Sequence, residues 1–169
     1  MSIAKYVDAA QANGADEQQI EVLERARDRG EVTFEDLNEL AELTKQCLRD
    51  AGFTVMDKDP REVVPGSGLR ITYYLSVQPD GMSDKTANEV MDDCSMRFDN
   101  WASAAFADQP TVVDAYNNQW DTPEVRACLK ERGYQIDDDM TGTELNNLSM
   151  EDWEAHSSDP SYQACDPIG

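Results

Sequence analysis

The four cysteines are the residues whose chemistry is easiest to anticipate, because a thiol can oxidise or bind a metal. They are Cys47, Cys94, Cys128 and Cys165. No CxxC or HxxxH pair is present, and structural zinc usually needs ligands at such close spacing. Two disulfides or four reduced, buried thiols are therefore the favoured alternatives. Four cysteines allow three disulfide connectivities.

A repeated phrase favours one of these connectivities. The segment "QCLRDAGFTVMD" at 46–57 aligns without a gap with "ACLKERGYQIDD" at 127–138. Each copy has the pattern of a helix end, a glycine stop and an extended segment that begins with an aromatic residue. Each copy is also followed by one later cysteine, so the repeat predicts the bridges Cys47–Cys94 and Cys128–Cys165. Such bridges indicate an oxidising compartment.

A weak calcium motif begins at the end of the second copy of the phrase. Asp137, Asp139 and Thr141 occupy positions 1, 3 and 5 of an EF-hand-like loop. Position 12, where the bidentate Glu belongs, is Leu148, and position 8, which should be apolar, is Glu144. Because the strongest ligand is missing, we interpret the stretch as a capped loop, with weak calcium binding as the alternative. We expect no resident metal and no cofactor.

Catalytic chemistry is not favoured by the residue pattern. The single histidine, His156, lies in an acidic tail segment, and a Ser-His-Asp or Cys-His arrangement would have to use it. Carboxylates are so frequent that the pair Asp92-Asp93 carries no information about acid–base catalysis. We assign no catalytic residue and expect a protein that is not an enzyme.

Three aromatic side chains are the candidate binding residues. Most aromatic residues of the chain recur at core-facing spacing, so the hydrophobic core is their first interpretation. Tyr74, Trp101 and Trp120 could instead line a groove for a partner or ligand, because Tyr and Trp often anchor interfaces.

These residues must be positioned by a mostly helical scaffold. Apolar periodicity and capping residues predict helices over 2–14, 16–30, 33–52, 84–107 and 121–133, with a further helical candidate at 111–120. Residues 69–77 alternate cleanly and form the best strand, while 53–57 and 134–137 are shorter strand candidates. Residues 57–68 are predicted to form a loop, and the tail segment 149–156 only a helical turn or two.

We therefore expect an α+β fold in one compact domain. An N-terminal helical hairpin over 2–30 precedes a small antiparallel sheet with packed helices. The internal repeat divides the remainder into two helix–Gly–strand units stapled by disulfides, at about 33–107 and 121–169. A chain of 169 residues suits a single domain of this kind.

The charge of the chain limits its partners. There are 35 acidic and 14 basic residues, so the formal net charge is -21. Such a charge repels phosphate backbones and anionic lipid, so we expect no direct binding to nucleic acid and another protein as the partner. More specific interpretations of the acidic charge are a cationic partner, binding of divalent cations or mimicry of nucleic acid. No apolar run approaches the roughly 20 residues of a membrane span.

The segments "GEVTFEDLNELAELTKQCLRDAGF", "MDDCSMRF", "DQPTVVDAYNNQW" and "CLKERGY", with the paired tyrosines of 69–77, together carry a family resemblance. Over roughly residues 15–140 the chain resembles small exported proteins and lipoproteins of high-GC Gram-positive bacteria. The resemblance implies structural motifs rather than an activity. It also implies an N-terminal export signal, often with a lipid-anchor cysteine, which the start "MSIAKYVDAA" lacks. An actinophage origin would explain the same composition.

The leading functional expectation is a non-enzymatic binding or structural module of a bacterial cell envelope, secreted or envelope-associated, with a lipid anchor if a signal was removed. The first alternative is a phage protein, either a virion component or an acidic DNA mimic that blocks a host protein, located in the virion or the host cytoplasm. The second is a carboxylate-based hydrolase. The residues do not indicate an oligomeric state.

Overall fold

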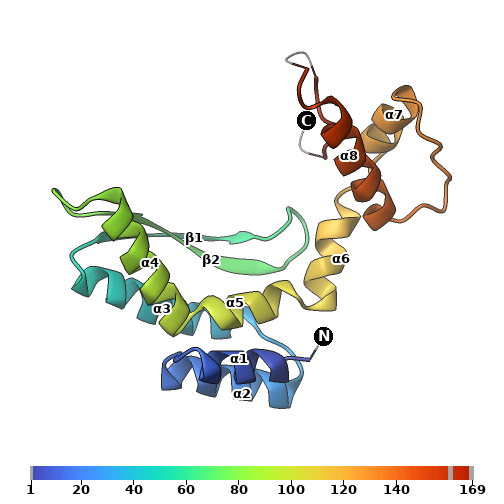
Figure 1. The fold of residues 1–169 in the computed structure, drawn as a ribbon. Helices are drawn as coiled ribbons and strands as arrows, with labels where there is room; N and C mark the ends of the chain where they lie inside the picture. The colour runs from blue at the N-terminus through green and yellow to red at the C-terminus, as the bar shows by residue number, and fades with distance from the viewer. Residues whose placement is uncertain (1, 160–161, 168–169) are drawn as a thin grey trace. The chain divides into compact units, whose positions relative to one another are not determined.

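The computed structural model describes residues 2–159 and 162–167 and has eight helices and two strands within these ranges (Figure 1). In chain order they are α1 Ala4–Ala12, α2 Glu17–Arg29, α3 Phe34–Asp50, β1 Thr54–Glu62, β2 Arg70–Val77, α4 Asp84–Phe98, α5 Asn100–Ala107, α6 Pro110–Asn118, α7 Pro123–Glu131 and α8 Gly142–His156. This is a helix-rich α+β fold with a small antiparallel sheet, as predicted. None of the helices in the described ranges is both long and apolar enough to cross a membrane.

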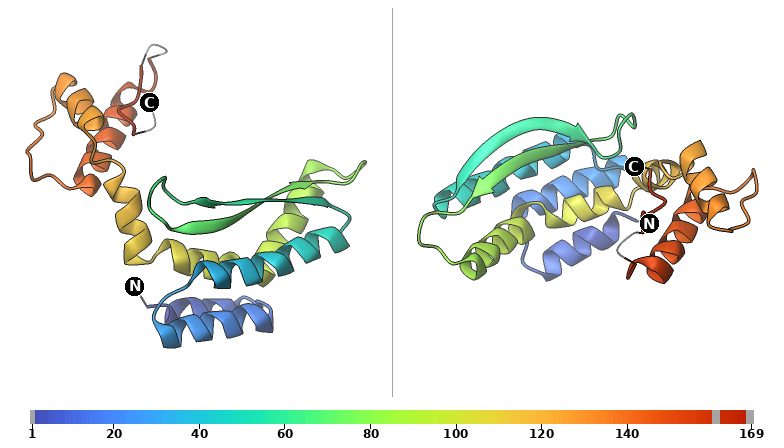
Figure 2. Two further views of the ribbon diagram at one scale, coloured as in Figure 1. Left: turned by 180° about the vertical axis from the view of Figure 1, so that it is seen from behind. Right: turned by 90° about the horizontal axis from the view of Figure 1, so that it is seen from above.

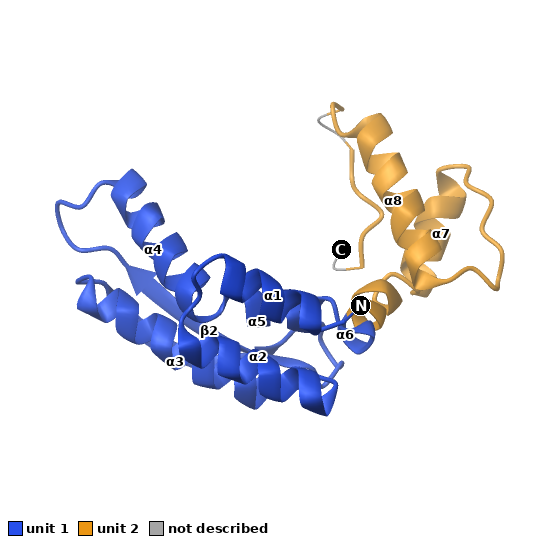
Figure 3. Cartoon of the chain, turned by 60° about the horizontal axis from the view of Figure 1, so that its bottom comes forward, with its two compact units in different colours: residues 1–112 blue, residues 113–169 orange. Residues whose placement is uncertain are grey.

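The chain forms two compact units, residues 1–112 and 113–169 (Figure 3). The predicted repeat unit 33–107 lies in the first, and the predicted unit 121–169 lies in the second. The expectation of one compact domain over the whole chain stays a prediction.

The first unit is built on α1, α2 and α3, whose boundaries follow their capping residues. The Asp16 carboxylate accepts a hydrogen bond from the Gln18 backbone N–H (3.0 Å), and Gly30 ends α2 with a left-handed φ of 96°. Thr33 and Asp36 form the capping box that begins α3. The apolar faces of these helices share one core with α5 through Val7, Ala10, Val22, Leu23, Ala26, Leu37, Leu40, Ala102, Ala105 and Phe106.

The helix predicted over 84–107 is interrupted, so α4 and α5 are separate. Gln19 of α2 is fully buried at the interruption. Its side-chain amide donates to the carbonyl oxygens of Met96 (3.2 Å) and Arg97 (2.8 Å), and its oxygen accepts from the backbone N–H of Trp101 (2.7 Å). Gln19 therefore satisfies backbone groups that the helix break would otherwise leave unpaired in the core.

The strand β1 is longer than predicted and runs through the first half of the segment expected to be a loop. Its register with β2 pairs Thr54 with Val77 and Lys58 with Tyr73, and it shifts by one residue between Lys58 and Arg61. This bulge accommodates Pro60, which cannot donate a ladder hydrogen bond. The two-stranded sheet lies over α3 (Figure 2).

The inner face of the sheet contains polar groups whose partners lie on α3. The Thr72 hydroxyl lies 3.4 Å from the Asn38 side-chain oxygen, and the Asp57 carboxylate accepts from the buried Lys45 ammonium (2.5 Å). Tyr74 packs in the apolar cluster around Phe53. On the opposite face, Met56, Leu75 and Val77 are 40%, 39% and 52% exposed.

The second unit consists of the larger part of α6, the turn that follows it, α7, α8, their connection and the C-terminal tail. Its core is a separate cluster of Val125, Leu129, Ile136, Leu145 and Cys165. The predicted strand at 134–137 is wrong, because this segment has no regular secondary structure and pairs with no strand in the described ranges. The prediction for 149–156 is also corrected: the Thr141–Glu144 capping box begins a helix of fifteen residues, α8.

Both copies of the repeated phrase have the same structure from the helix end to the aromatic residue, but only the first continues into a strand. The Phe53 N–H donates to the Leu48 carbonyl (3.0 Å), and the Tyr134 N–H donates to the Leu129 carbonyl (3.1 Å). The glycines between them, at 52 and 133, have φ values of 92° and 93°, a region open to glycine at little cost.

Each copy also carries its own disulfide. The bridges are Cys47–Cys94 and Cys128–Cys165, with Cα–Cα distances of 5.8 and 5.7 Å, and no free cysteine occurs in the described chain. This is the connectivity that the repeat predicts. The two bridges suggest an oxidising, extracytoplasmic environment.

Candidate binding pocket beside the Cys128–Cys165 disulfide

A pocket of about 300 Å³ opens in the second unit. One wall is the surface of α8, a second is the C-terminal tail next to the disulfide, and Trp120 comes from the turn that follows α6. The lining residues are Trp120, Ser149, Met150, Trp153, Ala164, Cys165 and Asp166.

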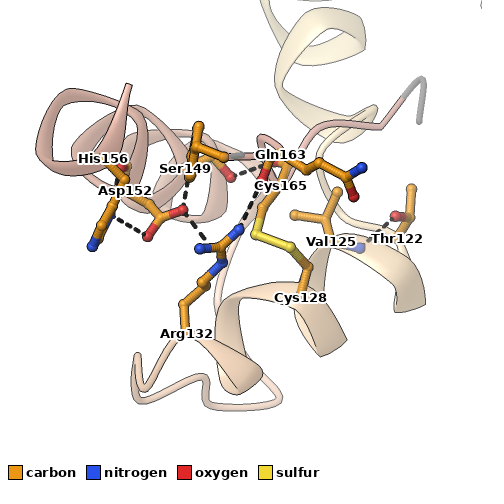
Figure 4. The surroundings of a disulfide bond; sticks show 10 residues. Thr122, Val125, Cys128, Arg132, Ser149, Asp152, His156, Gln163 and Cys165 are labelled. Atoms are coloured by element: carbon orange, nitrogen blue, oxygen red, sulfur yellow. Dashed lines mark hydrogen bonds and ion pairs between the residues drawn. A yellow bond between two sulfur atoms is a disulfide. The ribbon is translucent and has the colours of Figure 1, made fainter. Parts of the chain in front are cut away.

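The tail wall is tied to the helices by covalent and polar bonds (Figure 4). The Ser149 hydroxyl of α8 donates to the Cys165 carbonyl oxygen (2.9 Å), and the disulfide joins the same residue to Cys128 of α7. The Arg132 guanidinium donates to the Gln163 carbonyl oxygen (2.9 Å). Because three bonds hold Gln163 and Cys165, this part of the tail is fixed in place without regular secondary structure.

A buried carboxylate supports the tail from the next turn of α8. Asp152 has no exposed surface, and its Oδ2 accepts from the Tyr162 hydroxyl (2.8 Å) and lies 4.0 Å from the Arg132 Nε. Its Oδ1 makes no hydrogen bond of good geometry, although the His156 Nδ1 lies 3.2 Å away. Burial and the hydrogen bond to Asp152 raise the pKa of Tyr162 to about 12. This tyrosine therefore remains a neutral donor at physiological pH.

The pocket is apolar with one carboxylate. Trp153 and Met150 are 49% and 48% exposed, an unusual state for large apolar side chains that stand next to each other on one helix. The Ser149 hydroxyl is already engaged by the tail. Asp166 provides the charged lining group. Such a site can bury an apolar or aromatic group and place it near a negative charge.

The three candidate aromatic residues fall in different places. Trp120 lines the pocket, whereas Tyr74 and Trp101 belong to the first unit. Tyr74 is half-buried in the cluster between sheet and helices, where burial, then the charge of Asp99, raises its pKa to about 12. Trp101 packs against the main core, and its buried Nε1 has no hydrogen-bond partner among the described residues.

Sequence reasoning missed Met150 and Trp153. They stand three residues apart in "SMEDWEAH", which is the spacing of one helical face. That spacing indicates that the two side chains share a helical face. A predicted helix of only one or two turns, however, does not single them out as binding residues.

Two of the three calcium candidates contact neighbouring groups. The Thr141 hydroxyl accepts from the Glu144 backbone N–H (3.3 Å), and the Arg126 guanidinium donates to the Asp137 carbonyl oxygen (2.9 Å). The hydrogen bond to Asp121, with the nearby charges of that residue and the loop aspartates, raises the pKa of Arg126. No group of three or more metal-ligating side chains gathers within the described ranges. Weak calcium binding by Asp137, Asp139 and Thr141 stays a prediction.

No family model, curated protein or solved structure matches this chain. Its function is therefore inferred from the pocket, its charge and the disulfides.

Proposed function

We propose that this protein is a non-enzymatic, extracytoplasmic binding module of a bacterial cell envelope, and that its pocket receives one side chain of a partner protein. The observation that carries the proposal is the half-exposed pair Met150 and Trp153 at the pocket. Exposed aromatic and Met side chains at a concave site are typical of interfaces, where a partner completes their burial.

The size of the pocket favours a single anchoring group. At about 300 Å³ it lies at the lower limit of sites that enclose a small-molecule ligand. A partner protein can insert one side chain there and make its remaining contacts outside the pocket, as interface anchors commonly do.

The covalent framework supports a location outside the cytoplasm. Each unit has its own bridge, and bridges of this kind persist in oxidising compartments. The Cys128–Cys165 bridge also holds a pocket wall, because Cys165 is itself a lining residue. The disulfide that needs an oxidising environment therefore also forms part of the binding site.

The three tryptophans allow a direct test of the pocket. We expect N-acetyl-leucinamide and N-acetyl-tryptophanamide to shift the indole N–H resonances of Trp120 and Trp153 in the oxidised protein. Trp101 lies in the first unit and is the internal control. A Trp153→Ala variant should lose most of the shift at Trp120. Absence of shifts, or equal shifts at all three indoles, would contradict a specific pocket.

The proposed location needs a separate measurement. We expect the protein from its native source to be recovered in the envelope or secreted fraction, with both disulfides found by non-reducing peptide mapping. Recovery from the cytoplasm with four reduced thiols would refute the extracytoplasmic part of the proposal.

A further inference from the structure

We infer that the side chain bound in the pocket is cationic, and specifically a lysine of the partner protein. This inference rests on the proposed binding function and names the ligand class of the same site. It follows from the unused indole faces, the charge of the second unit and the lining of the pocket.

Among the described residues, no cation–π contact involves either indole of the pocket. The cation–π contacts of the described residues place Lys or Arg over the rings of Tyr6, Tyr73, Phe34, Phe98 and Tyr162. In the same ranges, the single aromatic stack joins His156 and Tyr162. Trp120 and Trp153 are thus engaged in neither type of contact, although tryptophan is the strongest aromatic acceptor for a cation.

The electrostatic field around the pocket favours a positive ligand. Between residues 113 and 169 there are thirteen acidic and three basic residues. Two of the three bases are already engaged within the unit: Arg126 with Asp121 (2.7 Å), and Arg132 with the buried Asp152 and the tail. The net negative charge of this unit attracts a cationic partner and raises its rate of association.

One carboxylate lies in the pocket lining, and two exposed carboxylates of α8 are next to lining residues in the sequence. Asp166 lines the pocket, and Glu151 and Glu154 are exposed residues that directly follow Met150 and Trp153 on α8. The four-carbon stem of lysine can pack along the apolar lining while its ammonium remains near these acids and solvent. A neutral apolar side chain would use the same walls but gain nothing from the charge.

A matched pair of probes separates this inference from the proposed function. N-acetyl-lysine methylamide and N-acetyl-norleucine methylamide share the same linear stem, and the lysine probe alone carries an ammonium. Titrations of the oxidised full chain would follow the indole resonances of Trp120 and Trp153 at low and high salt. We expect the lysine probe to bind about 3- to 10-fold more tightly at low salt, with a smaller advantage at high salt.

Two variants locate the source of the preference. Asp166→Asn should reduce the lysine advantage and leave norleucine binding unchanged, whereas Glu131→Gln removes the same charge from an exposed site outside the lining and should change little. Trp153→Leu keeps an apolar wall without an indole face, and it too should reduce the advantage.

Each outcome of the titrations has one meaning. Equal binding of the two probes at low salt, or tighter binding of norleucine, overturns the cationic ligand but leaves the proposed binding function intact. Binding of neither probe overturns both.

Discussion

Asp99 lies between α4 and α5, where burial makes the ionised form of its carboxyl unfavourable. Burial raises the pKa of the Asp99 carboxyl, while hydrogen bonds with Ser95 (2.6 Å) and Thr44 partly offset this. A carboxyl whose pKa is raised by folding binds its proton more tightly in the native state than in the unfolded chain. Its ionisation therefore lowers the free energy of unfolding as pH rises from the unfolded pKa through the folded pKa.

Replacing this carboxyl by its amide should remove that pH dependence. We expect the Asp99→Asn variant to gain stability relative to the original protein as pH rises above about 4, until Asp99 is fully ionised. Chemical denaturation at a series of pH values measures the difference. Asp92→Asn, an exposed site on α4, controls for the change in net charge. A difference that is flat with pH, or falls as pH rises, would disprove the assignment.

At the scale of elements, the second unit depends on a close approach between α6 and the start of α8. Gly142 is fully enclosed there, and a Cβ at this position would lie 2.0 Å from the Asn117 carbonyl oxygen and 2.6 Å from its carbonyl carbon. Both atoms belong to backbone, which cannot move aside as a flexible side chain can. The first residue of α8 must therefore be glycine for packing reasons, although its φ is not left-handed.

This contact predicts a substitution effect opposite to helix propensity. Alanine is the better helix former by up to about 1 kcal/mol, yet Gly142→Ala should lower the free energy of unfolding of the second unit by about 1–3 kcal/mol through overpacking. Thr143→Ala, at the next and exposed position, is the control and should be nearly neutral. Thermal unfolding measured by circular dichroism gives both values. A stabilised Gly142→Ala protein would show that the contact is absent.

For the whole molecule, the two disulfides each support one compact unit with its own apolar cluster. Bridges that close loops of this size commonly stabilise a fold by about 2–4 kcal/mol. Because each bridge lies inside a single unit, its loss should weaken that unit far more than the other.

Paired cysteine variants test this independence. The double variant Cys128→Ser/Cys165→Ser should increase hydrogen exchange across 113–169 and abolish binding in the pocket, with little change in the first unit. Cys47→Ser/Cys94→Ser should do the converse and preserve the indole shifts of Trp120 and Trp153. Equal loosening of both units by either double variant would contradict two separately stabilised bodies.

Local signals in the sequence were sufficient to predict most of the elements. Capping residues marked the starts of α2, α3 and α7, and the glycines at 30, 52 and 133 marked helix ends, because these effects act over a few bonds. The repeated phrase predicted the disulfide connectivity because both copies form the same helix end before a cysteine partner. Trp120 was the one candidate binding residue that the pocket includes.

The tertiary structure determines the features that depend on contacts between residues far apart in the sequence. Gln19 accommodates a helix break some eighty residues away in sequence, and Lys45 and Asn38 engage polar groups on the inner face of the sheet while Leu75 and Val77 face solvent. The pocket forms because the C-terminal tail packs against α8 at Cys165. Periodicity along the chain reports which residues share a face, but the free energy of packing determines what that face contacts.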